Sequence, residues 1–184
     1  RSRDPEKIIN EAKTMVAQGV REVVLLGQII DRYGLDLPTG SPRLPDLLEQ
    51  LSMIPELMRI RFLTSHPNWM NDQLIDAVAQ LPKVMPHIEV PIQAGDDAVL
   101  AAMRRGYTNQ QYRELVAKLR ERIPGVSIAT DVIVGFPGES EAAFQKTYDL
   151  LADLRLDVAH LARYSPRPGT YSARYLEDDV PAEE

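Results

Sequence analysis

The sequence predicts an α/β fold with parallel strands, and two observations support this. Short apolar or β-branched runs alternate with amphipathic helical patterns along the chain. Each apolar run ends in a string that is polar or rich in Gly and Pro, as expected where a strand leaves a parallel sheet. An eightfold barrel of this kind needs about 250 residues, and this chain has 184. Because the chain begins on a helix, which in such folds follows a strand, we interpret it as a partial (β/α) barrel whose first strand precedes Arg1.

Helices are expected where a capping residue precedes apolar residues at helical spacing. The first helix opens at Asp4 and Pro5 and ends at Gly19. Thr108 and Gln111 form the signature of a capping box, which opens a long helix. The other helices are expected at about 45–53, after Asn71, after Asp96, and after Ser140 with Phe144, Tyr148 and Leu151 as its apolar residues.

About five strands are expected between these helices. They are Val20–Leu26, interpreted as a buried strand, Met58–Leu63, His87–Ile92, Val126–Val134 and Asp157–Tyr164. We expect residues 1–173 to form the folded core. The acidic segment 174–184 is expected to be an unstructured tail or linker.

The composition excludes several classes of protein. The chain has no cysteine, so it offers neither a disulfide nor a thiolate metal ligand. Its three histidines show no metal-ligand spacing, and no metal site is expected. No apolar run approaches the roughly 18 residues that span a bilayer, and the start of the chain does not have the pattern of a signal peptide. The net charge of −6 argues against gripping nucleic acid by bulk electrostatics but permits a local basic patch.

The strand at 87–93 carries a polar face. Because strand side chains alternate, His87, Glu89 and Gln93 share one side, opposite three apolar residues. In a parallel barrel the apolar side packs on helices, so the polar side is expected to face a cavity. A buried pair between His87 and Glu89 is the alternative. Asp131 lies in an apolar strand and needs a partner, which is either a structural hydrogen bond or a ligand.

Four arginines lie near strand exits or the adjacent turns. They are Arg104, Arg105, Arg163 and Arg167. One interpretation is that they are solvated or paired with the acidic residues; the other is contact with nucleic-acid phosphates.

The strand-exit strings, taken in order, resemble the radical S-adenosylmethionine methylthiotransferases, and most closely their MiaB-like tRNA branch. The match extends from Arg1 to about Ala173. The strings are Leu25-Leu26-Gly27-Gln28 with Tyr33-Gly34, Arg61-Phe62 with Thr64-Ser65-His66-Pro67, Pro91-Ile92-Gln93 with Gly95, residues 103–108, residues 130–139 and residues 164–170.

This resemblance implies a six-stranded partial barrel that holds S-adenosylmethionine over a [4Fe-4S] cluster and cleaves it to a deoxyadenosyl radical. A second cluster serves sulfur insertion. In such proteins a CxxxCxxC string lies just before the position of Arg1. The chain therefore ligates neither cluster and is expected to be inactive alone. The resemblance also implies an N-terminal domain and a C-terminal RNA-binding domain outside this chain.

The resemblance implies specific binding residues. The S-adenosylmethionine face is expected to include Gln28, Ser65, Gln93, Asp131, Ile133, Gly135 and Arg163, with Ile133 against the adenine. The substrate side is expected to include Glu89, Arg104, Arg105 and Arg167. No residue is assigned a catalytic role.

The implied reaction of the parent protein is addition of a methylthio group to isopentenyl-adenosine beside the tRNA anticodon, in the cytoplasm. The alternatives are a sister enzyme acting on threonylcarbamoyl-adenosine or on a ribosomal-protein aspartate, or a cluster-free scaffolding barrel. The sequence departs from the usual pattern at Ile29, Asp31, Glu89, Ala94 and Asp96. The expected partner is tRNA, with no DNA or membrane. The open sheet edge beside Val20–Leu26 is also expected to permit non-native self-association.

Overall fold

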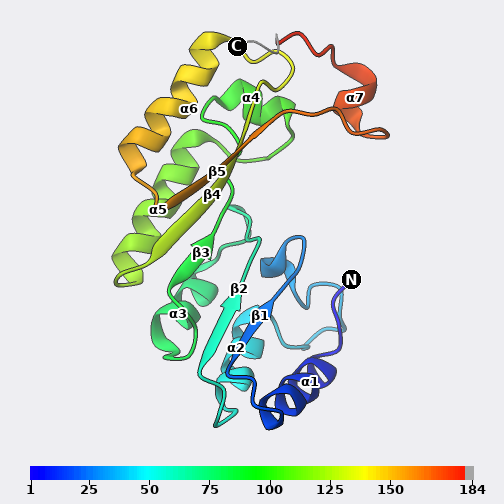
Figure 1. Ribbon diagram of the computed structural model, residues 1–184, viewed down its shortest axis with the longest axis vertical. Coiled ribbons are helices and arrows are strands. Elements are labelled where there is room, and N and C mark those ends of the chain that lie inside the picture. Colours follow the sequence, from blue (N-terminus) through cyan, green and yellow to red (C-terminus); the bar gives the residue numbers. More distant parts are fainter. Residues whose placement is uncertain (181–184) are drawn as a thin grey trace. The chain divides into compact units, whose positions relative to one another are not determined.

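The computed structural model describes residues 1–180 (Figure 1). The chain divides into two compact units. Unit 1 comprises Arg1–Glu89 and Lys118–Ser127, and unit 2 comprises Val90–Ala117 and the residues from Ile128 onward. Both are α/β in character, so the predicted fold class is confirmed, and no closed barrel forms among the described residues.

Unit 1 is built around a parallel strand pair. Strand β1 (Glu22–Leu25) pairs with β2 (Arg59–Phe62), in a register from Glu22 opposite Arg59 to Leu25 opposite Phe62. Ile60 also forms a parallel bridge with Val84. The other elements are α1 (Pro5–Ala17), η1 (Ile30–Arg32), α2 (Leu44–Ser52), α3 (Asp72–Gln80) and β3 (His87–Glu89).

Unit 2 contains the second parallel pair. Strand β4 (Ser127–Val134) pairs with β5 (Val158–Arg163), in a register from Ala129 opposite Val158 to Val134 opposite Arg163. The segment after β3 runs along the other edge of β4, where Gln93 bridges Val132. The helices are α4 (Asp97–Ala102), α5 (Asn109–Arg122), α6 (Glu141–Leu154) and α7 (Tyr171–Tyr175), with the C-terminal turn of α5 belonging to unit 1.

Each unit has its own apolar core. In unit 1 the helices α2 and α3 bury their apolar faces, and Ile60 and Phe62 of β2 are about fully buried. In unit 2 the core is formed by Tyr112, Ile128, Val132 and Leu150, together with other residues from α4, α5 and β4. Burial of these side chains supplies the main stabilisation of the fold.

The helix starts follow the capping residues. The side chains of Asp4, Asn71, Asp96 and Ser140 each accept a hydrogen bond from a first-turn N–H. The capping box also forms: the Thr108 N–H donates to Gln111 Oε1 at 2.9 Å, and the Gln111 N–H to Thr108 Oγ1 at 3.2 Å. These predictions are confirmed because a cap depends on residues only two or three positions apart.

Three local predictions are wrong. The strand expected at 20–26 is shorter and is not buried, since Val24 and Leu26 are 44% and 74% exposed. The reason is that, among the described residues, β1 pairs with a strand on one side only. Helix α6 buries Ala143, Thr147 and Leu150 rather than the expected Phe144 and Tyr148.

The third difference concerns the acidic segment from residue 174. Helix α7 extends into it through Tyr175, capped by Thr170, so its first residues are structured. Residues 181–184 of that prediction lie outside the described part of the chain. Within residues 1–180, none of the helices combines the length and the hydropathy that a membrane crossing requires.

Candidate functional site

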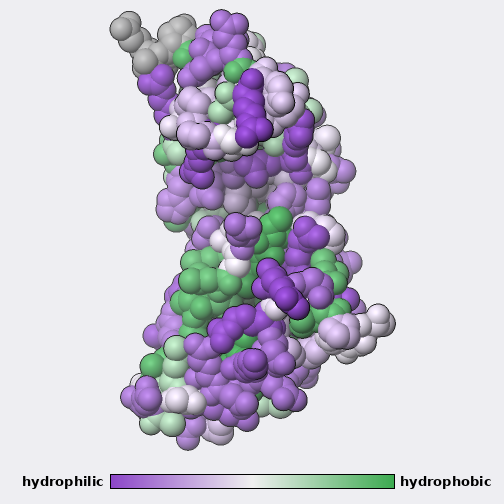
Figure 2. Space-filling model, turned by 90° about the vertical axis from the view of Figure 1, so that its right-hand side faces the viewer, coloured by the Kyte–Doolittle hydropathy of each residue, from purple (hydrophilic) through white to green (hydrophobic). Residues whose placement is uncertain are grey.

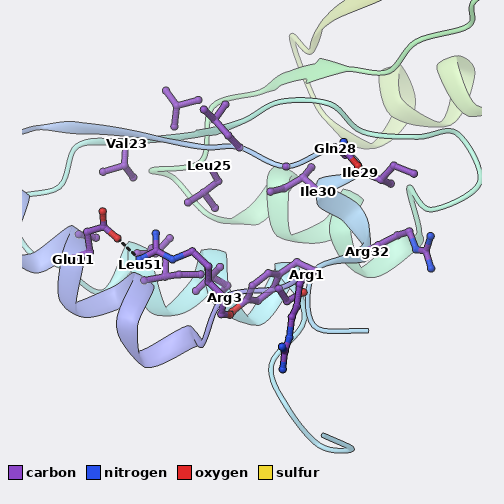
Figure 3. A pocket seen from close by; sticks show the side chains of 18 of the residues that line it. Arg1, Arg3, Glu11, Val23, Leu25, Gln28, Ile29, Ile30, Arg32 and Leu51 are labelled. Atoms are coloured by element: carbon purple, nitrogen blue, oxygen red, sulfur yellow. Dashed lines mark hydrogen bonds and ion pairs between the residues drawn. The ribbon is translucent and has the colours of Figure 1, made fainter. Parts of the chain in front are cut away.

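A cleft of about 680 Å³ lies at the free edge of β1 in unit 1. Figure 3 shows Val23 and Leu25 projecting from β1 toward the helices, with the Arg3–Glu11 ion pair beside them. Gln28, which the family resemblance implies as a cofactor residue, is exposed and lines this cleft. Figure 2 shows hydrophobic surface on this unit, where Met15, Val24 and Leu26 are among the exposed apolar residues.

The loops after β1 and β2 are joined by hydrogen bonds. The Ile30 N–H donates to the Thr64 carbonyl at 3.2 Å, and the His66 N–H donates to Asp31 Oδ2 at 2.9 Å. Ser65 is 3% exposed, and its N–H donates to the carbonyl of Glu89 at 3.0 Å. Ser65 is therefore fixed by its main chain to the end of β3, where half-buried Glu89 lies.

Among residues 1–180, two buried oxygens at these loops have no hydrogen-bond partner. They are Oδ1 of Asp31 and Oγ of Ser65. Burial raises the pKa of Asp31 to about 6, against the opposing effect of the His66 N–H. The β1 and β2 exits thus contain a carboxylate held in an environment that disfavours its charge.

Gln93 is buried and has an unusual backbone conformation. It is 7% exposed and has a φ of 74°, in the left-handed region that side-chain-bearing residues seldom adopt. Its N–H donates to the Asp131 carbonyl at 2.9 Å, and the Ile133 N–H donates to its carbonyl at 2.9 Å. The main chain thus brings Gln93, Asp131 and Ile133 together.

The side chains of this group remain available. Asp131 and Ile133 lie on the half-buried face of β4, while Thr130 and Val132 are buried on the opposite face. Within the described residues, the Asp131 carboxylate and the Gln93 side-chain amide make no hydrogen bond or ion pair. A carboxylate in an apolar strand usually has a hydrogen-bond partner within the protein, and Asp131 has none among the described residues.

The turn after β4 is closed by its own glutamate. Gly135 has a φ of 71°, and its N–H donates to Glu139 Oε2 at 2.6 Å. Burial raises the pKa of Glu139, and its Oε1 is buried with no hydrogen-bond partner among residues 1–180. The Gly138 N–H donates to Asp179 Oδ1 at 2.7 Å, which places the end of the described chain beside this turn.

The predicted arginines have different surroundings. The guanidinium of Arg104 lies 3.8 Å from the ring centroid of Tyr171, and Arg104 has a φ of 57°. Arg105 is half-buried, and its Nε has no hydrogen-bond partner among the described residues. Arg163 ends β5 opposite Val134, and Arg167 is exposed in the following turn.

Sequence reasoning missed several polar groups. His87 Nδ1 lies 3.3 Å from Ser127 Oγ and not in a pair with Glu89. Thr147 is buried and accepts a hydrogen bond from the Gly95 N–H at 2.8 Å. Thr147 lies on the same helix face as Ala143 and Leu150, and this spacing was the available signal that its hydroxyl is buried. Glu139 stood in the matched string 130–139 and Asp31 was noted only as a departure from the family pattern, and neither gave a sign of burial.

Of the two cofactors that the resemblance implies, the residues present fit S-adenosylmethionine and do not fit a [4Fe-4S] cluster. A free carboxylate and amide beside an aliphatic side chain suit a polar cofactor that carries a purine. A cluster does not fit, because the chain contains no cysteine. Among residues 1–180 there is also no group of three His, Asp or Glu side chains placed to hold a metal ion.

Comparison with known proteins gives matches along nearly the whole chain. It is 57% identical over 94% of its length to a tRNA-2-methylthio-N(6)-dimethylallyladenosine synthase from Roseiflexus sp. (strain RS-1), and 54% identical over 98% to one from Dehalococcoides mccartyi (strain CBDB1). These matches span 36% and 43% of those relatives, so the chain spans less than half the length of either.

Solved structures show the same fold. The radical S-adenosylmethionine methyltransferase TsrM from Kitasatospora setae, with cobalamin and a [4Fe-4S] cluster bound, aligns with a TM-score of 0.67 at 18% identity, over 88% of this chain and 31% of that one. SuiB from Streptococcus suis, bound to S-adenosylmethionine, aligns with a TM-score of 0.62 at 14% identity, over 92% and 36%. The model of the Radical SAM superfamily matches residues 1–151, and the chain belongs to that superfamily.

Proposed function

We propose that this chain is the core of a radical S-adenosylmethionine methylthiotransferase that modifies dimethylallyl-adenosine (isopentenyl-adenosine) in tRNA, in the cytoplasm. The family match and the relatives at 57% and 54% identity support the reaction class. The observation that carries the cofactor assignment is the unpaired Asp131 carboxylate beside Gln93 and Ile133. A carboxylate left without a partner in a folded protein is suited to a ligand with hydrogen-bond donors.

The residues have distinct proposed roles. Asp131 and Gln93 accept and donate hydrogen bonds to the polar part of S-adenosylmethionine, and Ile133 packs against the adenine. Gly135, whose φ of 71° suits glycine, allows the main chain to turn beside the cofactor. Gln28, Ser65 and Arg163 are also assigned to cofactor binding, and clusters ligated outside this chain supply the radical chemistry when bound.

Substrate contact is assigned to Glu89, Arg104, Arg105 and Arg167. The net charge of −6 disfavours non-specific attraction of RNA, so binding through this chain must depend on local arginines. Arg104 and Arg105 are adjacent at the end of α4, and planar guanidinium groups suit phosphate oxygens.

The cofactor assignment is tested by titrating the cluster-loaded, full-length protein with S-adenosylmethionine in a calorimeter. Asp131→Asn removes the charge without changing the shape and is expected to weaken binding about tenfold, the cost of one charge-assisted hydrogen bond. Asp149→Asn, on the exposed side of α6, is the matched control and is expected to bind like the unaltered protein. Equal affinities for the two variants would contradict the role of Asp131.

The reaction is tested by mass analysis of tRNA nucleosides from a deletion strain. Loss of the methylthio group from isopentenyl-adenosine, restored by the gene, is expected. Loss from threonylcarbamoyl-adenosine instead, or from a ribosomal protein with tRNA unchanged, would assign the protein to a sister reaction.

A further inference from the structure

The loop that carries Gln93 is fastened from both sides by helices of unit 2. The Gly95 N–H donates to Thr147 Oγ1 at 2.8 Å from the middle of α6. Asn109 Nδ2, at the start of α5, donates to the Gly95 carbonyl at 2.6 Å. Both polar groups of the Gly95 main chain are therefore held by side chains distant in sequence.

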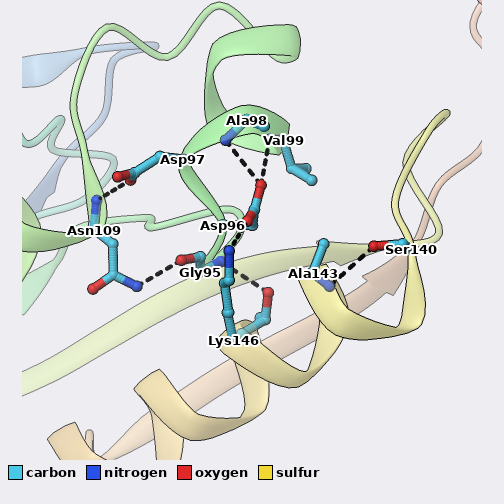
Figure 4. A network of polar contacts seen from close by, with 10 residues as sticks. Gly95, Asp96, Asp97, Ala98, Val99, Asn109, Ser140, Ala143 and Lys146 are labelled. Atoms are coloured by element: carbon cyan, nitrogen blue, oxygen red, sulfur yellow. Dashed lines mark hydrogen bonds and ion pairs between the residues drawn. The ribbon is translucent and has the colours of Figure 1, made fainter.

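The next residue is fastened as well (Figure 4). Asp96 Oδ1 accepts the N–H groups of Ala98 and Val99, and its Oδ2 accepts a hydrogen bond from Lys146 Nζ at 2.7 Å. Asn109 also donates its own N–H to Asp97 Oδ1 at 2.7 Å. The loop is thus bonded at three consecutive residues to α4, α5 and α6.

Helix α6 lies directly against this loop. A Cβ at Gly95 would stand 2.5 Å from the Lys146 carbonyl oxygen and 2.5 Å from Thr147 Cα. Thr147 itself is 2% exposed. A hydroxyl on the buried face of a helix needs a hydrogen-bond partner, and the Gly95 N–H is that partner.

Two residues before Gly95, Gln93 has its left-handed conformation. Such a conformation in a non-glycine residue persists only when the surrounding structure fixes it. On one side Gln93 is bonded to β4 through its N–H and carbonyl. On the other side the chain is fixed by Thr147 and Asn109 through Gly95.

We propose that Thr147 and Asn109 are positioning residues that hold Gln93 in the conformation that binds S-adenosylmethionine. This inference rests on the cofactor assignment made above and extends it to two residues that do not touch the cofactor. The hydrogen bond from Gly95 to Thr147 sets the direction of the loop, and the one from Asn109 prevents the Gly95 peptide from rotating. The Gln93 side chain is thereby oriented before the cofactor arrives.

The test uses Thr147→Val in the full-length, cluster-loaded protein. Valine keeps the shape of threonine and removes only the hydroxyl, which leaves the Gly95 N–H without its acceptor. The dissociation constant for S-adenosylmethionine is expected to rise about tenfold. Thr147→Ser restores the hydroxyl and is expected to return the constant to within about twofold of its original value.

The control is Ser140→Ala. It removes the N-cap of the same helix, where Ser140 accepts from the Ala143 N–H, without touching the loop. If Ser140→Ala weakens cofactor binding as much as Thr147→Val, or if serine does not rescue, the helix acts only through stability and the inference is overturned. If the unaltered protein does not bind S-adenosylmethionine, the cofactor assignment itself fails, and this is measured first.

A second variant covers the case in which Thr147→Val does not fold. Asn109→Asp removes the donor to Gly95 but keeps the oxygen that accepts from Arg113 Nε at 2.7 Å. Asn109 is only half-buried, so this variant is expected to fold. Weaker binding of S-adenosylmethionine with an unchanged unfolding temperature supports the inference, and unchanged binding overturns it.

Discussion

At the scale of single residues, two non-glycine positions at strand exits have left-handed backbones. Thr64 has a φ of 71° directly before Ser65, and Gln93 has a φ of 74°. Each such conformation costs roughly 1–3 kcal/mol and is typically retained at functional sites. Both lie in strings that were singled out for chemistry, so strain and candidate function coincide here.

Asp31 gives a prediction that depends on pH. Because burial raises its pKa to about 6, the folded state binds the proton more tightly than the unfolded state does. The stability from this group is therefore fully present below its unfolded pKa of 3.8 and is lost as pH rises through about 6. Asp31→Asn removes the buried charge while keeping an oxygen that can accept the His66 N–H.

The variant is expected to raise the free energy of unfolding at pH 8 by about 1–3 kcal/mol, and by much less near pH 4. Urea denaturation at the two pH values measures this difference. Asp36→Asn is the control, since a hydrogen bond from Ser2 lowers the pKa of exposed Asp36 and its effect has the opposite sign. A gain for Asp31→Asn that is the same at both pH values would contradict the argument.

At the scale of elements, α6 shows why its buried face was predicted wrongly. Periodicity favoured Phe144 and Tyr148, yet they are 39% and 61% exposed. The helix instead presents Thr147 to Gly95, because only glycine allows two main chains to approach so closely. A contact between residues 52 positions apart leaves no trace in local spacing.

Gly95→Ala tests that packing. The added methyl group meets main-chain atoms of α6 that cannot turn aside, so we expect a loss of roughly 1–3 kcal/mol of stability or more. Gly27→Ala is the matched control, because its nearest neighbour would be the terminal Cδ1 of the Ile30 side chain at 3.3 Å rather than main chain, and it is expected to cost little. Chemical denaturation compares the stability of the two variants. Equal losses of stability would mean that α6 moves to make room for the added methyl group at Gly95.

At the scale of the whole molecule, the chain has the scaffold of its superfamily but no cysteine. Reconstitution of the 184-residue chain with iron and sulfide is expected to give no cluster absorbance, since it contains no cysteine. A ferredoxin treated in parallel serves as the control. A cluster spectrum on the purified chain would show that other side chains can replace thiolates.

The sequence predicted much of the fold but less of the site. Caps such as Asp4 and Ser140 depend on neighbours and were predicted correctly. The grouping of Gln93 with Asp131 and Ile133 was expected only from the family resemblance, because it depends on strand pairing that no local pattern specifies. The burial of Asp31, the conformation of Gln93 and the hydrogen bond between Gly95 and Thr147 arise from tertiary contacts, which no local pattern encodes.

The stacking of Arg104 on Tyr171 has a consequence for the entropy of recognition. A long, flexible side chain normally loses its rotamer freedom when it binds, at a cost of up to roughly 2 kcal/mol. Arg104 already rests against the ring, so much of that freedom is lost on folding. The Tyr171 ring covers one face of the guanidinium, and no described residue accepts a hydrogen bond from its N–H groups. An anion that binds these N–H groups therefore contacts a side chain that folding has already ordered.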